Sequence, residues 1–401
     1  MTSPFSPLTE LPPDPILGIT EAYKADPRSD KVNLGVGIYL DESGKLARFQ
    51  SIQKAEEILF ARSEPKAYLP IDGMPEFNKA VQQLVLGADS SAIRDGRAVT
   101  VQALGGTGGL RIGADLLKLA APTAEVWISD PSWENHLALF TKAGFKVNSY
   151  PYYDASRRGL NIDAMLASMR SIAPGSILLL HACCHNPTGL DLTPAQWAQV
   201  KAIVIERGLI PFFDFAYQGF GLGVEEDAAA IREFVAAGLP CLISNSFSKS
   251  GSLYGERVGG LTVVSESKEE ARRVLSQVKR LVRTNYSNPP SWGAKLIATV
   301  FSDAGLKSQW VGELNAIRMR IQELRALFVK NLQLAGVDRD FSFVEQQIGM
   351  FSYTGIAATE VAKLRADFGI YMLDTGRICV AALNKTNVGP VCQAIAKTLK
   401  A

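Results

Sequence analysis

From about residue 100 the chain alternates short apolar runs with longer helical patterns, and this alternation restricts the possible fold more than any other feature. The apolar runs are too short to be helix cores and are rich in strand-forming residues, so each predicts a strand. Runs that are apolar on both faces and separated by helices indicate a parallel sheet covered by helices. The predicted strands are 125–129, 177–181, 210–213, 240–244 and 261–264.

The end of the chain has a different pattern, in which long helices are followed by short strands. This change predicts a smaller α+β domain after the sheet. At the other end, five prolines within the first 15 residues exclude a helix and predict an extended arm. The predicted helices are 193–206, 271–283 and 310–334, and the later strands are 350–353, 370–373 and 378–383.

Composition limits the class of protein. The chain has 401 residues, of which 47% are hydrophobic and 20% are charged, so it can bury a large core and form two domains. The net charge is only +2 and the two signs are interspersed, which argues against a nucleic-acid or membrane-surface partner. The N-terminus lacks the pattern of a signal peptide, and the five cysteines are odd in number, so we expect a cytoplasmic protein.

Polar residues follow the predicted strands at the points where the strands end. In an open α/β sheet ligands bind at the carboxyl ends of the strands, so one cleft is expected to collect these side chains. A lysine directly after an apolar strand is partly desolvated, which lowers its pKa and favours the neutral amine needed for Schiff-base chemistry; a solvent-exposed lysine is the alternative. The residues are Trp133, Asn186, Asp214, Tyr217, Ser246, Ser248 and Lys249.

A glycine-rich segment at 105–109 opens the helical pattern 110–120. Its N–H groups and the helix N-terminus could hold a phosphate, with Ser246, Ser248 and Arg257 completing the site, although a plain flexible turn is the alternative. The segment is not a Walker loop, because no Lys-Ser/Thr pair follows, and Arg111 breaks the dinucleotide fingerprint.

The cluster His181-Ala182-Cys183-Cys184-His185 is the one candidate for a metal site. Adjacent cysteines in an extended chain point to opposite faces, and no second Cys or His group completes a tetrahedral set. Core packing is therefore the preferred interpretation, and no metal is expected.

Several motifs together resemble the class I, pyridoxal-phosphate-dependent aspartate and aromatic amino acid aminotransferases, and look most like the bacterial aromatic-type enzymes. The resemblance runs from about Asp14 to the C-terminus. The motifs are His185-Asn186-Pro187-Thr188-Gly189, Asp214-Phe215-Ala216-Tyr217, Ser246-Phe247-Ser248-Lys249, Glu256-Arg257-Val258-Gly259, Asn285-Tyr286-Ser287-Asn288-Pro289-Pro290 and Gly376-Arg377.

The resemblance implies a role for each cofactor-binding residue. Lys249 matches the Schiff-base lysine and proton carrier, and Asp214 matches the carboxylate that keeps the pyridine nitrogen protonated. Trp133 matches the aromatic residue stacked on the ring. Asn186 and Tyr217 match the partners of the ring hydroxyl. The residues that match the phosphate-binding group are Gly106, Thr107, Ser246, Ser248 and Arg257.

The resemblance also implies substrate and subunit contacts. Arg377 matches the arginine that binds the substrate α-carboxylate, and Gly37 lies in a flexible segment that closes over the site. Tyr68 and Arg283 match residues that reach the phosphate and the distal carboxylate from the other subunit, which implies a homodimer with shared active sites. Two departures leave local rigidity open: Ser250-Gly251-Ser252 replaces a larger pair, and Gly109 stands where Ala is usual.

The fold implied is an α/β fold-type I transferase with a mixed, mostly parallel seven-stranded sheet. We expect an arm at 1–12, a small domain at 13–45 and 317–401, and a large cofactor domain at 46–316. The function implied is transamination of aromatic amino acids, aspartate and glutamate with 2-oxoglutarate or oxaloacetate by a ping-pong mechanism.

Three alternatives remain. A strict aspartate aminotransferase is the nearest. A phosphate-binding α/β protein without a Schiff base would leave Lys249 unexplained, and a metal protein would need ligands that the sequence lacks. Dual specificity is favoured because positions around the distal pocket mix both types: Ile38, Leu40, Leu46 and Ala67 are aromatic-type, whereas Thr107, Asn288 and Arg283 match aspartate enzymes.

Overall fold

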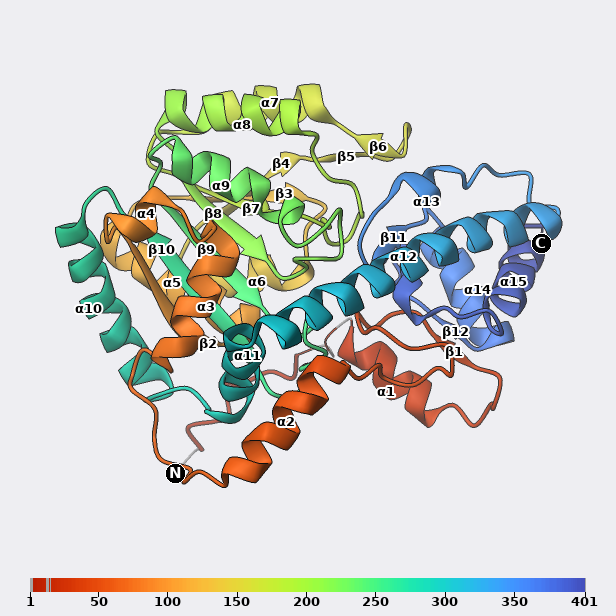
Figure 1. The fold of residues 1–401 in the computed structure, drawn as a ribbon. Coiled ribbons are helices and arrows are strands. Elements are labelled where there is room, and N and C mark those ends of the chain that lie inside the picture. The colour runs from red at the N-terminus through yellow and green to blue at the C-terminus, as the bar shows by residue number, and fades with distance from the viewer. Residues whose placement is uncertain (1–2, 12–13, 15, 401) are drawn as a thin grey trace.

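The computed structural model describes residues 3–11, 14 and 16–400, and its centre is a seven-stranded sheet (Figure 1). The strand order is β2-β10-β9-β8-β7-β3-β4. Strand β10 (Val258–Val264) runs antiparallel to both of its neighbours, and the remaining pairs are parallel. The predicted mixed, mostly parallel sheet is therefore confirmed. The other strands are β2 (Ala98–Leu104), β3 (Val126–Asp130), β4 (Val147–Pro151), β7 (Ile177–His181), β8 (Ile210–Phe215) and β9 (Cys241–Ser246).

Both faces of this sheet are buried, which explains why its strands are continuous apolar runs. Neighbouring residues of β8 show the arrangement: Phe212 packs into one hydrophobic cluster and Phe213 into the other. One face is covered by α5, α6 and α10, and the other by α3, α8, α9 and part of α12. The bounds are α3 (Pro75–Leu86), α4 (Ser91–Arg94), α5 (Gly105–Ala120), α6 (Glu134–Lys142), α7 (Ile162–Ser171), α8 (Pro194–Arg207), α9 (Ala229–Ala236) and α10 (Lys268–Asn285).

Two very small sheets lie beside the large one, at the end of the molecule that holds the C-terminus (Figure 1). Strand β1 (Val32–Asn33) pairs in parallel with β12 (Ile370–Tyr371), and β11 (Phe351–Tyr353) pairs antiparallel with β13 (Arg377–Cys379). Segments from both ends of the chain thus meet here. The hairpin β5 (Tyr153–Asp154) and β6 (Gly159–Leu160) forms a further pair, and the helices of this part are α1 (Leu17–Ala25), α13 (Phe343–Gln346), α14 (Ala358–Phe368) and α15 (Val388–Lys400).

Helix α12 (Ala304–Leu334) runs across the molecule and connects these parts (Figure 1). It packs on α2 (Gln50–Arg62) and α11 (Trp292–Ser302) near its start and on α13 and α15 near its end. Trp310, fully buried, donates from Nε1 to the Ser250 carbonyl at 2.6 Å. Arg325, 1% exposed, donates from Nη2 to the carbonyls of Gly349 (2.8 Å) and Phe351 (2.5 Å). One helix therefore anchors both the turn after Lys249 and the strand β11.

Three local expectations differ from the structure. Helix α5 begins at Gly105, so the glycine run expected to precede the helical pattern 110–120 is itself the first turn of the helix. The predicted strand 378–383 is β13 followed by a 3₁₀ turn over Val380–Ala382, in which the Leu383 N–H bonds back to the Val380 carbonyl. Strands β2 and β4 were not predicted.

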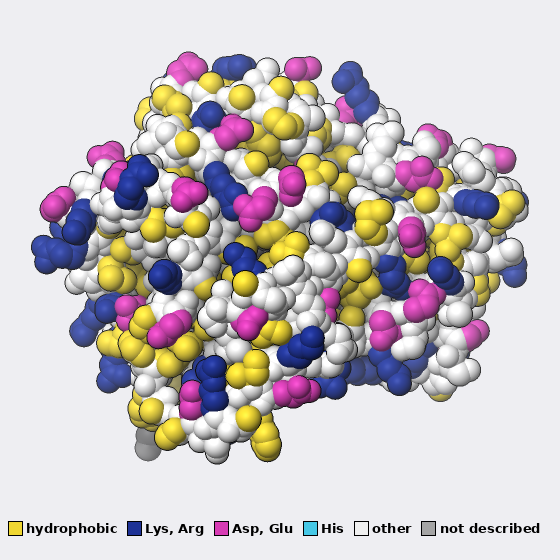
Figure 2. Space-filling view, in the orientation of Figure 1, with side chains coloured by type: hydrophobic (Ala, Val, Ile, Leu, Met, Phe, Trp, Pro, Cys, Tyr) yellow, Lys and Arg dark blue, Asp and Glu magenta, His cyan; other side chains and the backbone are white. Residues whose placement is uncertain are grey.

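The predicted arm is described over 3–11 and contains no helix or strand there, while Pro12, Pro13 and Pro15 lie outside the described residues. Its large side chains Phe5 and Leu8 are 71% and 75% exposed. In the described chain, no helix has the length and apolar character needed to cross a bilayer. Figure 2 shows basic and acidic side chains interspersed over the visible face, in agreement with the near-zero net charge.

Gly109→Ala is expected to lower the free energy of unfolding by about 1–3 kcal/mol, because the added methyl group overpacks the contact between α5 and the sheet. A Cβ at position 109 would lie 2.5 Å from Ser244 Oγ and 3.0 Å from the Gly260 carbonyl oxygen. Urea unfolding measures the loss. Adding Ser244→Ala removes the nearer atom and should restore part of it. Equal stability of Gly109→Ala and the wild type would contradict this packing.

Candidate active site

A cavity of about 630 Å³ opens at the carboxyl ends of the central strands. Its wall is built from the turns after β3, β7, β8 and β9, the start of α5, and two segments of the smaller part around Gly37 and Arg377. The structure therefore brings together the polar residues that the strand-end pattern predicted. The predicted residues in the wall are Gly37, Gly106, Thr107, Trp133, Asn186, Asp214, Tyr217, Ser246, Ser248, Lys249, Arg257 and Arg377.

Lys249 lies in the turn after β9 and is partly buried. Burial lowers the pKa of its amine to about 8, although the nearby Asp214 carboxylate acts in the opposite direction. The Nζ atom lies 5.0 Å from the centre of the Tyr217 ring. A large fraction of this amine is thus neutral at pH values near 8, which is the form that attacks a carbonyl carbon.

Asp214 lies near the end of β8 and directs its carboxylate at His136 and the cavity. Its Oδ2 contacts His136 Nε2 at 2.8 Å, and His136 Nδ1 contacts Ser132 Oγ at 2.9 Å. Burial alone would raise the pKa of this carboxyl, but the His136 hydrogen bond and the surrounding positive charges outweigh it and hold the pKa below its ordinary value. The second oxygen, Oδ1, is buried without a hydrogen-bond partner, so it can accept a proton donor from a bound ligand.

The N-terminus of α5 and the Arg257 guanidinium form an anion-binding corner of the cavity. Gly106 and Thr107 lie in the first turn of α5, where backbone N–H groups have no intrahelical partner. Arg257 donates from Nη1 to Ser248 Oγ at 3.3 Å, and its guanidinium lies so close to Gly105 that a Cβ there would be 2.6 Å from Nη2. These donors match a phosphate group, and the flexible-turn alternative is wrong for the glycine run because it is helical.

Arg377, in β13, supplies a second anion-binding group in the wall of the cavity. It is 1% exposed, and it donates from Nη1 to Asn186 Oδ1 (3.0 Å) and from Nη2 to the Gly35 carbonyl (2.7 Å). Its guanidinium carbon lies 4.3 Å from the centre of the Phe351 ring. Burial lowers its pKa, and Nε is buried without a partner. A buried guanidinium held this firmly suits recognition of a carboxylate.

Comparison with known proteins decides the family. The sequence model of the family "Aminotransferase class I and II" matches residues 29–395 of this chain. The chain belongs to this family.

Individual relatives match nearly the whole chain. Aspartate aminotransferase of Pseudomonas aeruginosa is 51% identical over 395 residues, which cover 98% of this chain and 99% of that protein. Aromatic-amino-acid aminotransferase of Escherichia coli is 49% identical over 387 residues, covering 96% and 98%. The crystal structure of aromatic-amino-acid aminotransferase from Burkholderia pseudomallei covalently bound to pyridoxal phosphate has a TM-score of 0.97 and 55% identity, covering 99% of this chain and 100% of that one. The predicted family and fold are confirmed.

Two predicted residues of this aminotransferase lie outside the cavity. Tyr68 is 92% exposed, and Arg283 is an exposed residue near the end of α10 whose Nη1 contacts Ser287 Oγ. The resemblance assigns both to the neighbouring subunit's site. Their positions on the surface of one chain accord with that assignment, which stays a prediction.

Sequence reasoning missed several residues of the site, among them His136, Tyr254 and Phe351. His136 has a recognisable signal, because it follows Trp133, the N-cap residue of α6, by three residues and the two rings are 5.1 Å apart, edge to face. Tyr254 and Phe351 line the cavity without any spacing that marks them. Phe351 belongs to β11, so only the tertiary fold brings it under Arg377.

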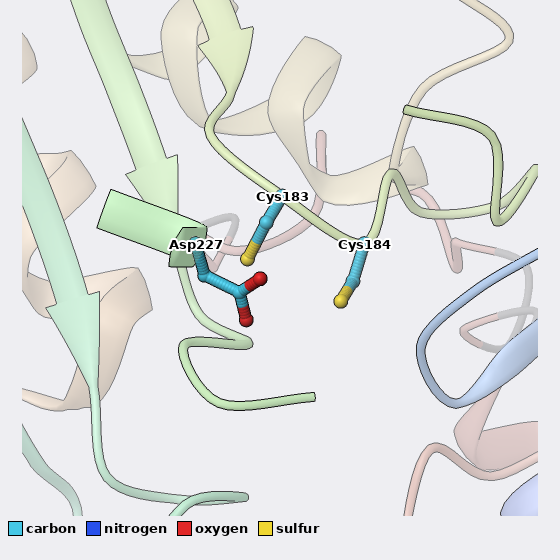
Figure 3. A group of neighbouring side chains, drawn as sticks. All are labelled: Cys183, Cys184 and Asp227. Atoms are coloured by element: carbon cyan, nitrogen blue, oxygen red, sulfur yellow. The ribbon is translucent and has the colours of Figure 1, made fainter. Parts of the chain in front are cut away.

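Cys183, Cys184 and Asp227 form the one group of neighbouring side chains among the described residues whose atoms could hold a metal ion (Figure 3). The expectation that the two sulfurs point to opposite faces is wrong, because Cys184 has a left-handed backbone (φ 51°) and both sulfurs turn toward Asp227. The Asp227 carboxylate already accepts backbone N–H groups from the loop 219–223 on both oxygens, and burial raises the pKa of both thiols. The group is explained as a buried loop anchor.

Proposed function

We propose that this aminotransferase uses pyridoxal phosphate to transfer amino groups from L-aromatic amino acids, L-aspartate and L-glutamate to 2-oxoglutarate or oxaloacetate, in two half-reactions. The observation that carries the proposal is one cavity containing an amine with a pKa of about 8, a carboxylate with a free oxygen and two separate anion-binding groups. The relatives named for aspartate and for aromatic amino acids support both substrate classes.

The residues fit the cofactor group by group. The unpartnered Asp214 Oδ1 is available to a protonated pyridine nitrogen, and the corner made by α5 and Arg257 is available to the phosphate. Arg257 donates to Ser248 Oγ and to the Tyr254 carbonyl, and Arg377 donates to Asn186 Oδ1 and to the Gly35 carbonyl. These acceptors are uncharged, so each guanidinium can accept an anionic ligand. The cofactor bound in the Burkholderia pseudomallei relative supports the same choice here.

When bound, pyridoxal phosphate supplies an electron sink that stabilises negative charge at the amino acid α-carbon. Lys249 would hold the cofactor through Nζ, and the same atom, once free, would move the proton. Asp214 keeps the ring nitrogen protonated, because its carboxylate is ionised and held by His136. Trp133 would lie over the ring, and Asn186 and Tyr217 would bind its hydroxyl.

Substrate recognition is assigned to the two arginines and to Gly37. Arg377 binds the α-carboxylate that every substrate carries, and Arg283 of a second copy binds the distal carboxylate of a dicarboxylic substrate. Gly37 cannot be replaced without a shift, because a Cβ there would lie 2.6 Å from Phe351 Cζ. Strict aspartate specificity is the alternative.

The proposal extends to the assembly and the location of the protein. We infer a homodimer with shared active sites, because Tyr68 and Arg283 are exposed and do not line their own chain's cavity. We infer a cytoplasmic protein, because all five cysteines are buried free thiols. The proposed large domain at 46–316 holds the seven-stranded sheet; the proposed boundary at 317 falls inside α12, so that helix belongs to both domains.

Lys249→Ala is expected to fold and bind the cofactor without covalent attachment, and to lose multiple turnover, since the nucleophile and the proton carrier are the same atom. Borohydride treatment followed by unfolding should leave the cofactor on the wild-type chain and release it from the variant. Lys201→Ala, which removes a surface lysine paired with Glu233, is the matched control. Turnover by Lys249→Ala close to the wild-type rate would refute the assignment.

Arg377→Leu is expected to reduce kcat/KM for every amino and keto acid by at least about tenfold, because each loses charge-assisted hydrogen bonds of roughly 1.5–3 kcal/mol. Arg283→Leu should reduce kcat/KM for aspartate, glutamate and 2-oxoglutarate far more than for phenylalanine or tyrosine. Steady-state kinetics with both substrate sets measures the difference. Equal losses across the two sets would contradict the separate roles.

Dual specificity predicts that kcat/KM for phenylalanine and tyrosine lies within about a thousandfold of that for aspartate, a gap of ~4 kcal/mol or less. Of the four aromatic-type positions, Ile38 lines the cavity, Leu40 and Leu46 pair in a β-bridge, and Ala67 is exposed. Apolar walls stabilise a buried ring by roughly 1.5–3 kcal/mol. A donor panel with 2-oxoglutarate decides between dual and strict aspartate specificity.

A further inference from the structure

One edge of the cavity is formed by backbone rather than by long side chains. Val36, Gly37 and Ile38 all line the cavity, and the Ile38 N–H donates to the Val36 carbonyl at 3.0 Å, which makes a tight turn centred on Gly37. Gly37 packs against Phe351, the ring that also lies under Arg377. The Gly37 turn and the Arg377 guanidinium therefore both pack against the Phe351 ring.

The peptide bond that follows this turn is held on both sides. The Tyr39 N–H donates to the Tyr254 hydroxyl oxygen at 2.9 Å, and the Ile38 carbonyl accepts from Cys379 Sγ at 3.4 Å. Both polar groups of a single peptide are thus satisfied by side chains from distant parts of the chain. Tyr39 is 7% exposed and Cys379 fully buried, so water has little access to replace either bond.

The two side chains come from the segments that carry the reactive groups. Tyr254 lies five residues after Lys249, and its carbonyl accepts from Arg257 Nη1 at 3.0 Å. Cys379 lies two residues after Arg377 on β13. Arg377 itself bonds the Gly35 carbonyl, at the other end of the turn. The turn is therefore tied at Gly35 by the guanidinium and at the Ile38–Tyr39 peptide by Tyr254 and Cys379.

We propose that Tyr254 and Cys379 are positioning residues that fix the Gly37 turn relative to Arg377 and so set the affinity of the site for its substrates. This inference rests on the proposed function, because it assigns the Gly37 turn to the substrate side of the cavity. A peptide released from these bonds lets the turn move away from Arg377, which weakens the hold on every substrate. Lys249, Asp214 and the anion-binding corner at α5 keep their own contacts, so the chemical step is preserved.

The test compares substitutions that remove one bond each in the cofactor-loaded enzyme. Tyr254→Phe removes the acceptor of the Tyr39 N–H and keeps the ring. Cys379→Ala removes the donor to the Ile38 carbonyl, whereas Cys379→Ser keeps a donor there. Ser252→Ala is the matched control, because Ser252 Oγ donates to the Ala47 carbonyl at 2.6 Å, from the same loop to the same segment but away from the turn.

Tyr254→Phe and Cys379→Ala are each expected to raise KM for amino and keto acids about five- to tenfold while kcat stays within twofold of the wild type. Cys379→Ser should recover most of the KM lost in Cys379→Ala, and Ser252→Ala should stay within twofold. The double variant Tyr254→Phe/Cys379→Ala should deviate from the product of the single effects, since both act on one peptide.

A second readout separates positioning of the turn from loosening of the lysine loop. The pH at which the bound cofactor changes its absorbance should be the same in all variants and the wild type. Unchanged KM in both Tyr254→Phe and Cys379→Ala, or a fall in kcat accompanied by a shifted absorbance titration, would overturn the proposal. The proposed function fails separately, if the wild type shows no cofactor-dependent transamination.

Discussion

Burial of the Lys249 amine beside the Asp214 carboxylate is the constraint on which the site depends. An ammonium group removed from water favours its neutral form, whereas a nearby carboxylate favours the charged form, and the balance leaves the pKa of Lys249 at about 8. Asp214 must stay ionised for this balance to hold. The His136 hydrogen bond ensures it, and the partnerless Oδ1 is left for a ligand. The protonation states of Lys249 and Asp214 thus depend on each other, and replacing either residue changes the pKa of the other.

The groups of the cavity are held in place by contacts with backbone carbonyl groups as well as with side chains. Arg377 is held by Asn186 and by the Gly35 carbonyl, and it rests on Phe351, whose own carbonyl is held by Arg325. A charged guanidinium in a dry interior needs hydrogen-bond partners for most of its donors. Arg325 finds these partners in carbonyl groups and the Ser352 hydroxyl rather than in an acid, so its charge also anchors β11 and the segment that leads into it.

Sequence reasoning recovered the elements in which local pattern and tertiary environment agree. Strands β7, β8 and β9 are apolar runs because both faces of the sheet are covered, and Asp214 and Lys249 were predicted because each follows such a run. Tyr254 and Cys379 were not predicted, since their partner is a peptide more than two hundred residues away along the chain. The positive φ of Cys184 could not be predicted either, because the sequence gives no sign that a non-glycine residue adopts this conformation.

Helix α12 also restricts how the length of this chain can vary. Trp310 and Arg325 are separated by fifteen residues, or about 22 Å of unbroken helix, and they anchor the turn after Lys249 and the strand under Arg377. Inserting or deleting one residue between them would turn one anchor about 100° around the helix axis relative to the other. Such a change cannot be absorbed locally, as it can in a surface loop. Descendants of this sequence are thus expected to keep the number of residues within this stretch of α12.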